Sequence, residues 1–165
     1  MLNDFFIENK TLFFTINWFF FVKIIIFISI SIPNIISDIK NKEVNSLLLA
    51  IISSILTIIS FFYNIKAFYY LLIGFFLIFI IFMFIYFVSS GGIGLGDMFY
   101  LFFINSIVGI FFTTIIFILT FWIATLILIP FLITRKLDKK SKIPLIPFFF
   151  IGFWVVWLIA LVIDV

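Results

Sequence analysis

Long apolar runs constrain this chain more than any other feature of its sequence. The longest stays apolar from Asp97 to Ile133. As one helix it would be about 56 Å long, nearly double the hydrocarbon thickness of a bilayer. It therefore has to turn back once. The turn is predicted at Asn105, Ser106 and Gly109, the turn-forming cluster near its middle.

The composition agrees with a membrane environment. Of the 165 residues, 67% are hydrophobic and only 10% are charged, and the mean hydropathy is +1.49. This excludes a soluble globular protein. The apolar runs reach the length of a bilayer-crossing helix and do not alternate as membrane strands do. The sequence therefore predicts an all-α, polytopic integral membrane protein with one domain over residues 1–165.

Six spans are predicted. Lys23 lies near the start of the first, so its ammonium group is expected to snorkel toward the outer surface. The spans cover residues 11–37, 44–62 and 67–88, a short fourth span after Asp97, a fifth ending near Thr134, and a sixth from the Pro144–Pro147 entry to near Asp164.

The distribution of basic residues predicts the orientation. Loops after the odd-numbered spans hold most of the ten Lys and Arg residues, whereas the opposite side holds Lys10 and Lys66. By the positive-inside rule the odd loops are cytoplasmic and both termini lie outside the cytoplasmic membrane. The basic residues of the odd loops are Lys40, Lys42, Arg135, Lys136, Lys139, Lys140 and Lys142.

The absence of cysteine and histidine narrows the possible chemistry. It excludes disulfides, thiol nucleophiles, Cys/His metal sites and histidine acid–base catalysis. No cofactor or metal is expected. Nucleic-acid binding is not expected either, because the net charge of +3 is small and concentrated on one side of the membrane. Carboxylates are the obvious catalytic groups that remain.

A cluster of glycines directly precedes one acidic residue. Gly91, Gly92, Gly94 and Gly96 lie just before Asp97. Glycine permits backbone conformations and close approaches that other residues do not, so the segment is predicted to be an irregular loop that presents Asp97. A carboxylate at mid-membrane costs about 2.5–3.5 kcal/mol on insertion scales, which indicates a function for Asp97.

Asp38 is predicted to lie at the same membrane face as Asp97, because two whole spans separate them. Paired carboxylates can hydrolyse a peptide bond: one activates water while the other, protonated, polarises the carbonyl. Two such groups at close range share one proton. Glu43 is the rival for the first position, but it lies deeper in the polar loop, where a solvated role is expected. The remaining acidic residues are predicted to be solvated flanks: Asp4, Glu8, Asp138 and Asp164.

Three segments together resemble a known family. They are Gly94-Leu95-Gly96-Asp97, the polar segment from Asp38 to Asn45, and Ile143-Pro144-Leu145-Ile146-Pro147-Phe148. Taken in chain order, with the Asp38 segment first, they resemble motifs of the type IV prepilin peptidases and archaeal preflagellin peptidases, which are membrane aspartyl proteases with a Gly-x-Gly-Asp motif. The first motif lacks its usual proline between Val44 and Asn45, and the last has its phenylalanine after the second proline.

The resemblance implies that Asp38 and Asp97 are the catalytic pair and that Gly94 and Gly96 shape the loop at Asp97. It implies a prepilin-like or preflagellin-like substrate, cut between a short basic cytoplasmic leader and an apolar helix in the bilayer. The chain resembles the short members of the family, without the cysteine pairs and N-terminal domain that accompany methyltransferase activity. No methylation of the product is therefore expected.

Three alternatives remain open. Proteases that resemble presenilin or signal peptide peptidase share the glycine–aspartate motif, but their first aspartate follows a tyrosine inside a span, whereas Asp38 follows Ser37. A small transporter or channel subunit could use Asp97 as a cation or proton site. Finally, both aspartates could be simple helix-end residues, with Asp97 interacting favourably with a helix dipole.

Overall fold

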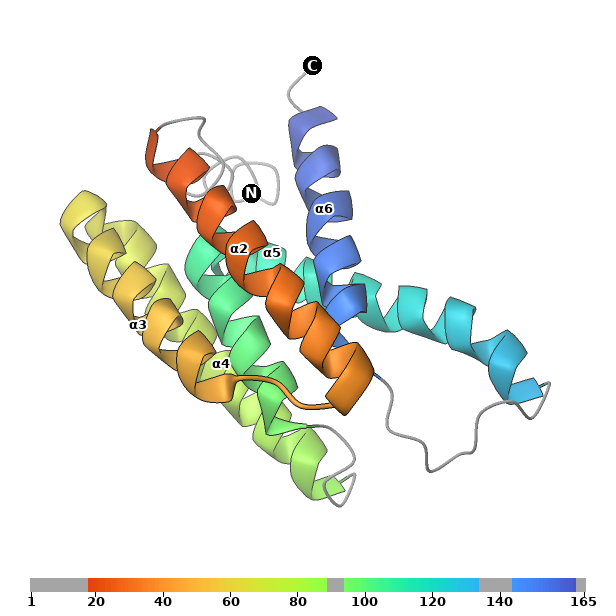
Figure 1. The fold of residues 1–165 in the computed structure, drawn as a ribbon. Coiled ribbons are helices and arrows are strands. Elements are labelled where there is room, and N and C mark those ends of the chain that lie inside the picture. The colour runs from red at the N-terminus through yellow and green to blue at the C-terminus, as the bar shows by residue number, and fades with distance from the viewer. Residues whose placement is uncertain (1–17, 89–93, 134–143, 163–165) are drawn as a thin grey trace, which may run out of the picture.

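The computed structural model describes residues 18–88, 94–133 and 144–162. This part of the chain is helical and contains no strand, which confirms the all-α prediction for these residues. Figure 1 shows the arrangement. The helices are α2 (Trp18–Asn41), α3 (Ser46–Tyr63), α4 (Ile65–Val88), α5 (Leu95–Ile133) and α6 (Ile146–Val162).

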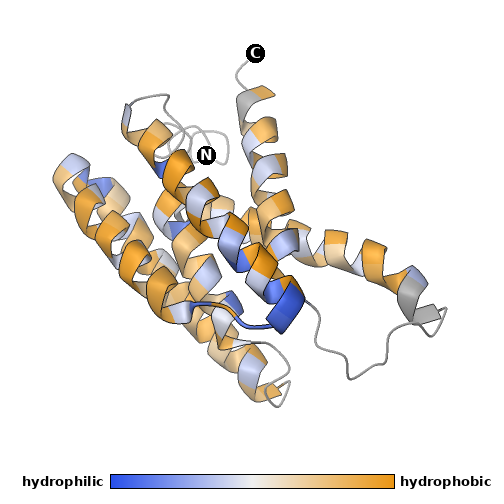
Figure 2. Cartoon of the chain, viewed as in Figure 1, coloured by the Kyte–Doolittle hydropathy of each residue, from blue (hydrophilic) through white to orange (hydrophobic). Residues whose placement is uncertain are grey.

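Four of these helices, α2 to α5, are long and apolar enough to cross a bilayer, and the apolar helix at Ile146–Ala160 is shorter. The chain is therefore compatible with a multi-pass membrane protein. In hydrocarbon a backbone must satisfy its own hydrogen bonds, which a helix does internally. Figure 2 shows hydrophilic residues gathered at the C-terminal end of α2 and its link to α3. The predicted count of six spans is not confirmed.

Helix α5 is the centre of the fold and packs against α2, α3, α4 and α6. Its first part is deeply buried, with Tyr100, Phe103 and Ile107 fully inaccessible. Gly109 then interrupts the helix with a non-helical backbone of φ 75° and ψ 170°, within the cluster where the sequence predicts a turn. That the chain turns back across a membrane here stays a prediction. After the break α5 changes direction and its end projects away from α2, α3 and α4 (Figure 1).

Lys23 does not snorkel, and the prediction that it does is wrong. The residue is 5% exposed. Its Nζ donates a hydrogen bond of 3.4 Å to the carbonyl oxygen of Ile107 and lies 4.8 Å from the centroid of the Phe19 ring. Ile107 closely precedes the break at Gly109. Carbonyl groups at the end of a helix lack intrahelical donors, so the buried ammonium group satisfies one of them.

One face of α2 is buried against α5 and α6. Phe27 anchors this face. Its ring stacks on that of Phe103 of α5, with the ring centroids 5.9 Å apart. It also stacks on the rings of Phe150 and Phe153 of α6, at centroid distances of 5.5 and 3.9 Å. This cluster fixes α2 relative to the helices that complete the candidate site. The buried residues of the face recur at helical spacing: Phe20, Lys23, Phe27, Ser31, Asn34 and Asp38.

The helix ends differ from the prediction mainly at α2. Asp38 was expected to begin the polar loop, but α2 runs on to Asn41, so Asp38 lies in its last turns. The helix ends where Lys42 adopts a left-handed φ of 56° and its N–H donates to the carbonyl of Asp38 at 3.1 Å. Asn45 then caps α3 by accepting a hydrogen bond from the N–H of Leu48 at 3.1 Å.

Candidate functional site

Three helix ends meet at the hydrophilic end of the molecule: the last turns of α2, the start of α5 and the start of α6 (Figure 1). Asp38 comes from α2 and Asp97 from α5. Both side chains are buried, with exposures of 5% and 9%, and their carboxyl groups are close enough for their charges to interact. The structure thus brings together the two acidic residues that the sequence singled out.

Asp38 is held from the side of α6. Its Oδ2 accepts a hydrogen bond of 3.0 Å from the backbone N–H of Ile146, the first residue of that helix. The partners are 108 positions apart in the chain. Lys42 is close enough for its charge to act on Asp38 as well. The carboxyl group of Asp38 therefore interacts with three groups: a backbone N–H, the ammonium group of Lys42 and the carboxyl group of Asp97.

Asp97 lies in the first turn of α5 and its position depends on two glycines. Its N–H donates to the carbonyl of Gly94 at 3.1 Å, and a Cβ on Gly94 would lie 3.3 Å from Oδ2 of Asp97. A Cβ on Gly96 would lie 2.7 Å from Cβ of Val44, so α5 can approach the link before α3 this closely only without a side chain there. Gly91 and Gly92 lie outside the described residues.

A second layer of polar groups joins α2 to its neighbours beside the aspartates. Tyr100 Oη donates a hydrogen bond of 2.8 Å to Oγ of Ser31, and both side chains are fully buried. Asn34 Oδ1 accepts a hydrogen bond of 3.2 Å from the N–H of Asn45, while its Nδ2 donates to the carbonyl of Ile30 at 2.9 Å. These contacts hold the end of α2 in register with α5 and the link to α3.

Sequence reasoning did not identify Tyr100. Helical spacing was a usable signal, because Tyr100 follows Asp97 by one turn and Ser31 and Asn34 share the face of Asp38. The Ile146 donor had no such signal, since a backbone N–H belongs to every residue except proline.

Among the described residues, Glu43 is the one acidic residue besides Asp38 and Asp97. Glu43 is exposed, as predicted. Across the described ranges, no group of three or more His, Cys, Asp or Glu side chains is placed to hold a metal ion. Four acidic residues lie outside those ranges, as does the basic loop at 135–142: Asp4, Glu8, Asp138 and Asp164.

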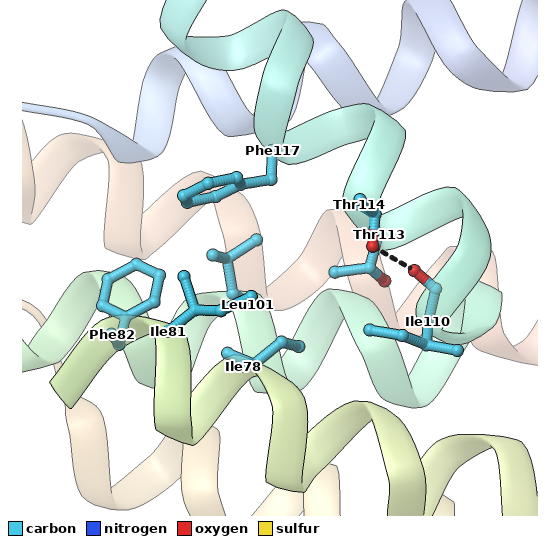
Figure 3. A pocket seen from close by; sticks show the side chains of 8 residues that line it. All are labelled: Ile78, Ile81, Phe82, Leu101, Ile110, Thr113, Thr114 and Phe117. Carbon is cyan, nitrogen blue, oxygen red and sulfur yellow. Dashed lines mark hydrogen bonds between the residues drawn. The ribbon is translucent and has the colours of Figure 1, made fainter. Parts of the chain in front are cut away.

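The structure also contains a small pocket that is not part of this site. It has a volume of about 40 Å³ and lies between α4 and α5, next to the break at Gly109 (Figure 3). Its polar groups are the hydroxyls of Thr113 and Thr114, which donate to the carbonyls of Gly109 and Ile110. Neither aspartate lines it. The pocket is therefore mainly apolar and contains no carboxyl group that could act as an acid or base.

Comparison of the chain with protein-family models, with curated proteins and with solved structures finds no match. The chemistry of the site therefore has to be argued from its own groups. A pair of buried carboxyl groups can hold one proton between them, accept a proton from water and donate one to a carbonyl oxygen.

Proposed function

We propose that the chain is a membrane aspartic endopeptidase that removes the basic leader from prepilin-like or preflagellin-like precursors. One observation carries the proposal: two buried carboxyl groups, from helices far apart in the sequence, are close enough for their charges to interact. The resemblance of the segments around Asp38 and Asp97 to the prepilin peptidases supplies the substrate class.

The proposed reaction needs only the aspartate pair and water. One ionised carboxylate takes a proton from the water molecule as its oxygen attacks the scissile carbonyl carbon, and the protonated partner donates a hydrogen to the carbonyl oxygen. When the tetrahedral intermediate collapses, the C–N bond breaks, the leaving amine takes up the proton that came from the water, and a hydroxyl group of the intermediate returns its proton to the partner carboxylate as the new carboxyl group forms. The pair ends with one proton, as it began.

The proposed topology places this reaction at the cytoplasmic membrane face. The break at Gly109 divides α5 into two crossings, which with α2, α3, α4 and α6 gives six. Both termini then lie outside, and the loops rich in Lys and Arg lie in the cytoplasm. A leader peptide that ends at the membrane surface would present its scissile bond at the level of Asp38 and Asp97.

The proposal is tested by co-expressing the chain with prepilin-like precursors and determining the size and N-terminal sequence of the product. Wild type should release the leader at its boundary with the apolar helix. Asp38→Asn and Asp97→Asn should each slow cleavage at least about 100-fold, the scale of acid–base catalysis, because an amide cannot replace a carboxyl group that shares a proton.

Glu43→Gln is the matched control, since it also converts a nearby carboxyl group to an amide but changes an exposed side chain. It should leave cleavage unchanged. Full cleavage by either aspartate variant would remove that residue from the proposed site. If a folded wild-type protein leaves every precursor uncut, the endopeptidase assignment is wrong, and ion flux that depends on Asp97 becomes the next measurement.

A further inference from the structure

The first turn of α6 leaves one backbone donor for a partner outside the helix. The N–H groups at the start of a helix have no intrahelical acceptor. In α6, Pro147 has no N–H, and the N–H groups of Phe148 and Phe149 both donate to the carbonyl of Leu145, at 3.0 and 3.1 Å. The remaining donor of this turn is the N–H of Ile146, which is fully buried and donates to Oδ2 of Asp38.

Asp38 lies where its own helix does not favour a negative charge. It is in the last turns of α2, at the negative end of the helix dipole, whereas the N-terminus of α6 has the opposite polarity. A hydrogen bond to an ionised acceptor is also stronger than one between neutral groups. Contact with α6 therefore offsets the unfavourable position of the carboxylate, and it fixes the rotation of the carboxyl group by occupying one of its two oxygens.

We infer that the backbone N–H of Ile146 is a positioning group for Asp38 in the reaction proposed above, on which this inference rests. The donor occupies Oδ2 and leaves Oδ1 to accept the proton of the attacking water. The sequence from Pro144 to Pro147 then has a specific role in the site: it starts α6 at the residue whose donor meets Asp38, and proline at the next position removes a competing donor. Helix α6 thus orients one carboxyl group of the aspartate pair, whose members come from α2 and α5.

Ile146→Pro tests this role because it deletes the N–H, and its one other main change is a buried side chain that is shorter by one carbon. Proline is well tolerated at the first position of a helix. The residue before it is restricted to extended conformations, which suit the N-cap position of Leu145. Ile146→Val is the matched control, since valine has as many side-chain carbons as proline but keeps the donor. Thermal unfolding in detergent reports whether the two variants are comparably folded.

Cleavage kinetics should separate the two variants. Ile146→Pro should lower kcat about tenfold or more relative to Ile146→Val, with little change in KM, since a charge-assisted hydrogen bond is lost beside the reacting groups while the substrate surface is unchanged. Equal kcat values would overturn the inference and leave the endopeptidase proposal standing. Absence of cleavage by wild type would overturn the endopeptidase proposal itself.

Amide hydrogen exchange provides a readout that needs no activity. With the chain in detergent micelles and labelled at isoleucine, the Ile146 amide should exchange slowly in wild type and about tenfold or more faster in Asp38→Ala, because its acceptor is gone. Asp97→Ala is the control and should leave this amide protected. Unchanged protection in Asp38→Ala would show that Asp38 does not hold the donor, and would overturn the inference even if Ile146→Pro does not fold.

Discussion

The close approach of Gly96 to Val44 explains why a residue without a side chain precedes Asp97. Any Cβ at position 96 would lie 2.7 Å from Cβ of Val44, nearer than such atoms pack. To relieve this contact, either α5 must move away from the link before α3, or Val44 must shift. If α5 moves, the carboxyl group of the neighbouring Asp97 moves relative to Asp38. The glycine therefore acts through the position of a helix.

Gly96→Ala is expected to lower the rate of precursor cleavage about tenfold or more, because catalysis is sensitive to displacements of about 1 Å. Val44→Gly in the same chain removes the opposing Cβ and should restore part of the lost rate. The measurement is cleavage of a purified precursor by the single and double variants. A Gly96→Ala protein as active as wild type would mean that the contact has no effect on the aspartate pair.

The polar residues beside the aspartates show where prediction from sequence ended. Asp38 and Asp97 could be paired from the number of spans between them, and Gly94 and Gly96 from the motif. The hydrogen bond between Tyr100 and Ser31 depends on how α2 and α5 are rotated about their axes, which the apolar pattern does not define, since lipid and protein accept the same side chains. The Ile146 donor is a main-chain group and carries no residue signature.

At the scale of the helices, Lys23 of α2 binds α5 just before its break at Gly109. The glycine adopts a φ of 75° and a ψ of 170°, a combination that is essentially confined to glycine. The lysine then pairs with a carbonyl oxygen just before the break. Gly109 belongs to the cluster at which a turn is predicted, because few turn-forming residues occur in that run. Sequence analysis missed the lysine, since nothing in the sequence connects a cation in α2 with a carbonyl in α5.

Lys23→Met is expected to destabilise the protein by about 1–3 kcal/mol, because it leaves a buried carbonyl without its donor. Lys23→Arg retains a cation and should lose less. The measurement is the thermal unfolding midpoint in detergent, with Lys66→Met as the control for removal of an exposed lysine. An unfolding midpoint of Lys23→Met equal to that of Lys66→Met would contradict a stabilising role for the buried ammonium group.

Helix positions were the most predictable part of the fold. The second and third spans, at 44–62 and 67–88, match α3 and α4 within two residues at each end, because polar residues bound their apolar runs. Helix α2 runs several residues beyond its predicted end at residue 37. The polar residues after Asp38 are typical of a loop, but they also suit the last turn of a helix, where Lys40 faces the negative end of its dipole.

For the whole molecule, the proposed topology makes opposite predictions for two exposed lysines. Lys40 lies in the last turn of α2, two residues after Asp38, and Lys66 lies in the first turn of α4. The chain contains no cysteine, so single-cysteine variants at these positions provide unambiguous labels. Lys40→Cys should react with a membrane-impermeant thiol reagent only from the cytoplasmic side, and Lys66→Cys only from outside. Labelling of both from the same side would overturn the topology.

The hydrogen bond between Ile146 and Asp38 has a consequence for biosynthesis. The two aspartates leave the ribosome well before Ile146, so a nascent chain can bring its carboxyl groups together while Oδ2 of Asp38 still lacks its backbone partner. The contact forms only when the last described helix enters the membrane. If the Ile146 N–H is needed for cleavage, a growing chain stays inactive until α6 has been synthesised. Activity then begins when α6 packs against α2 and α5.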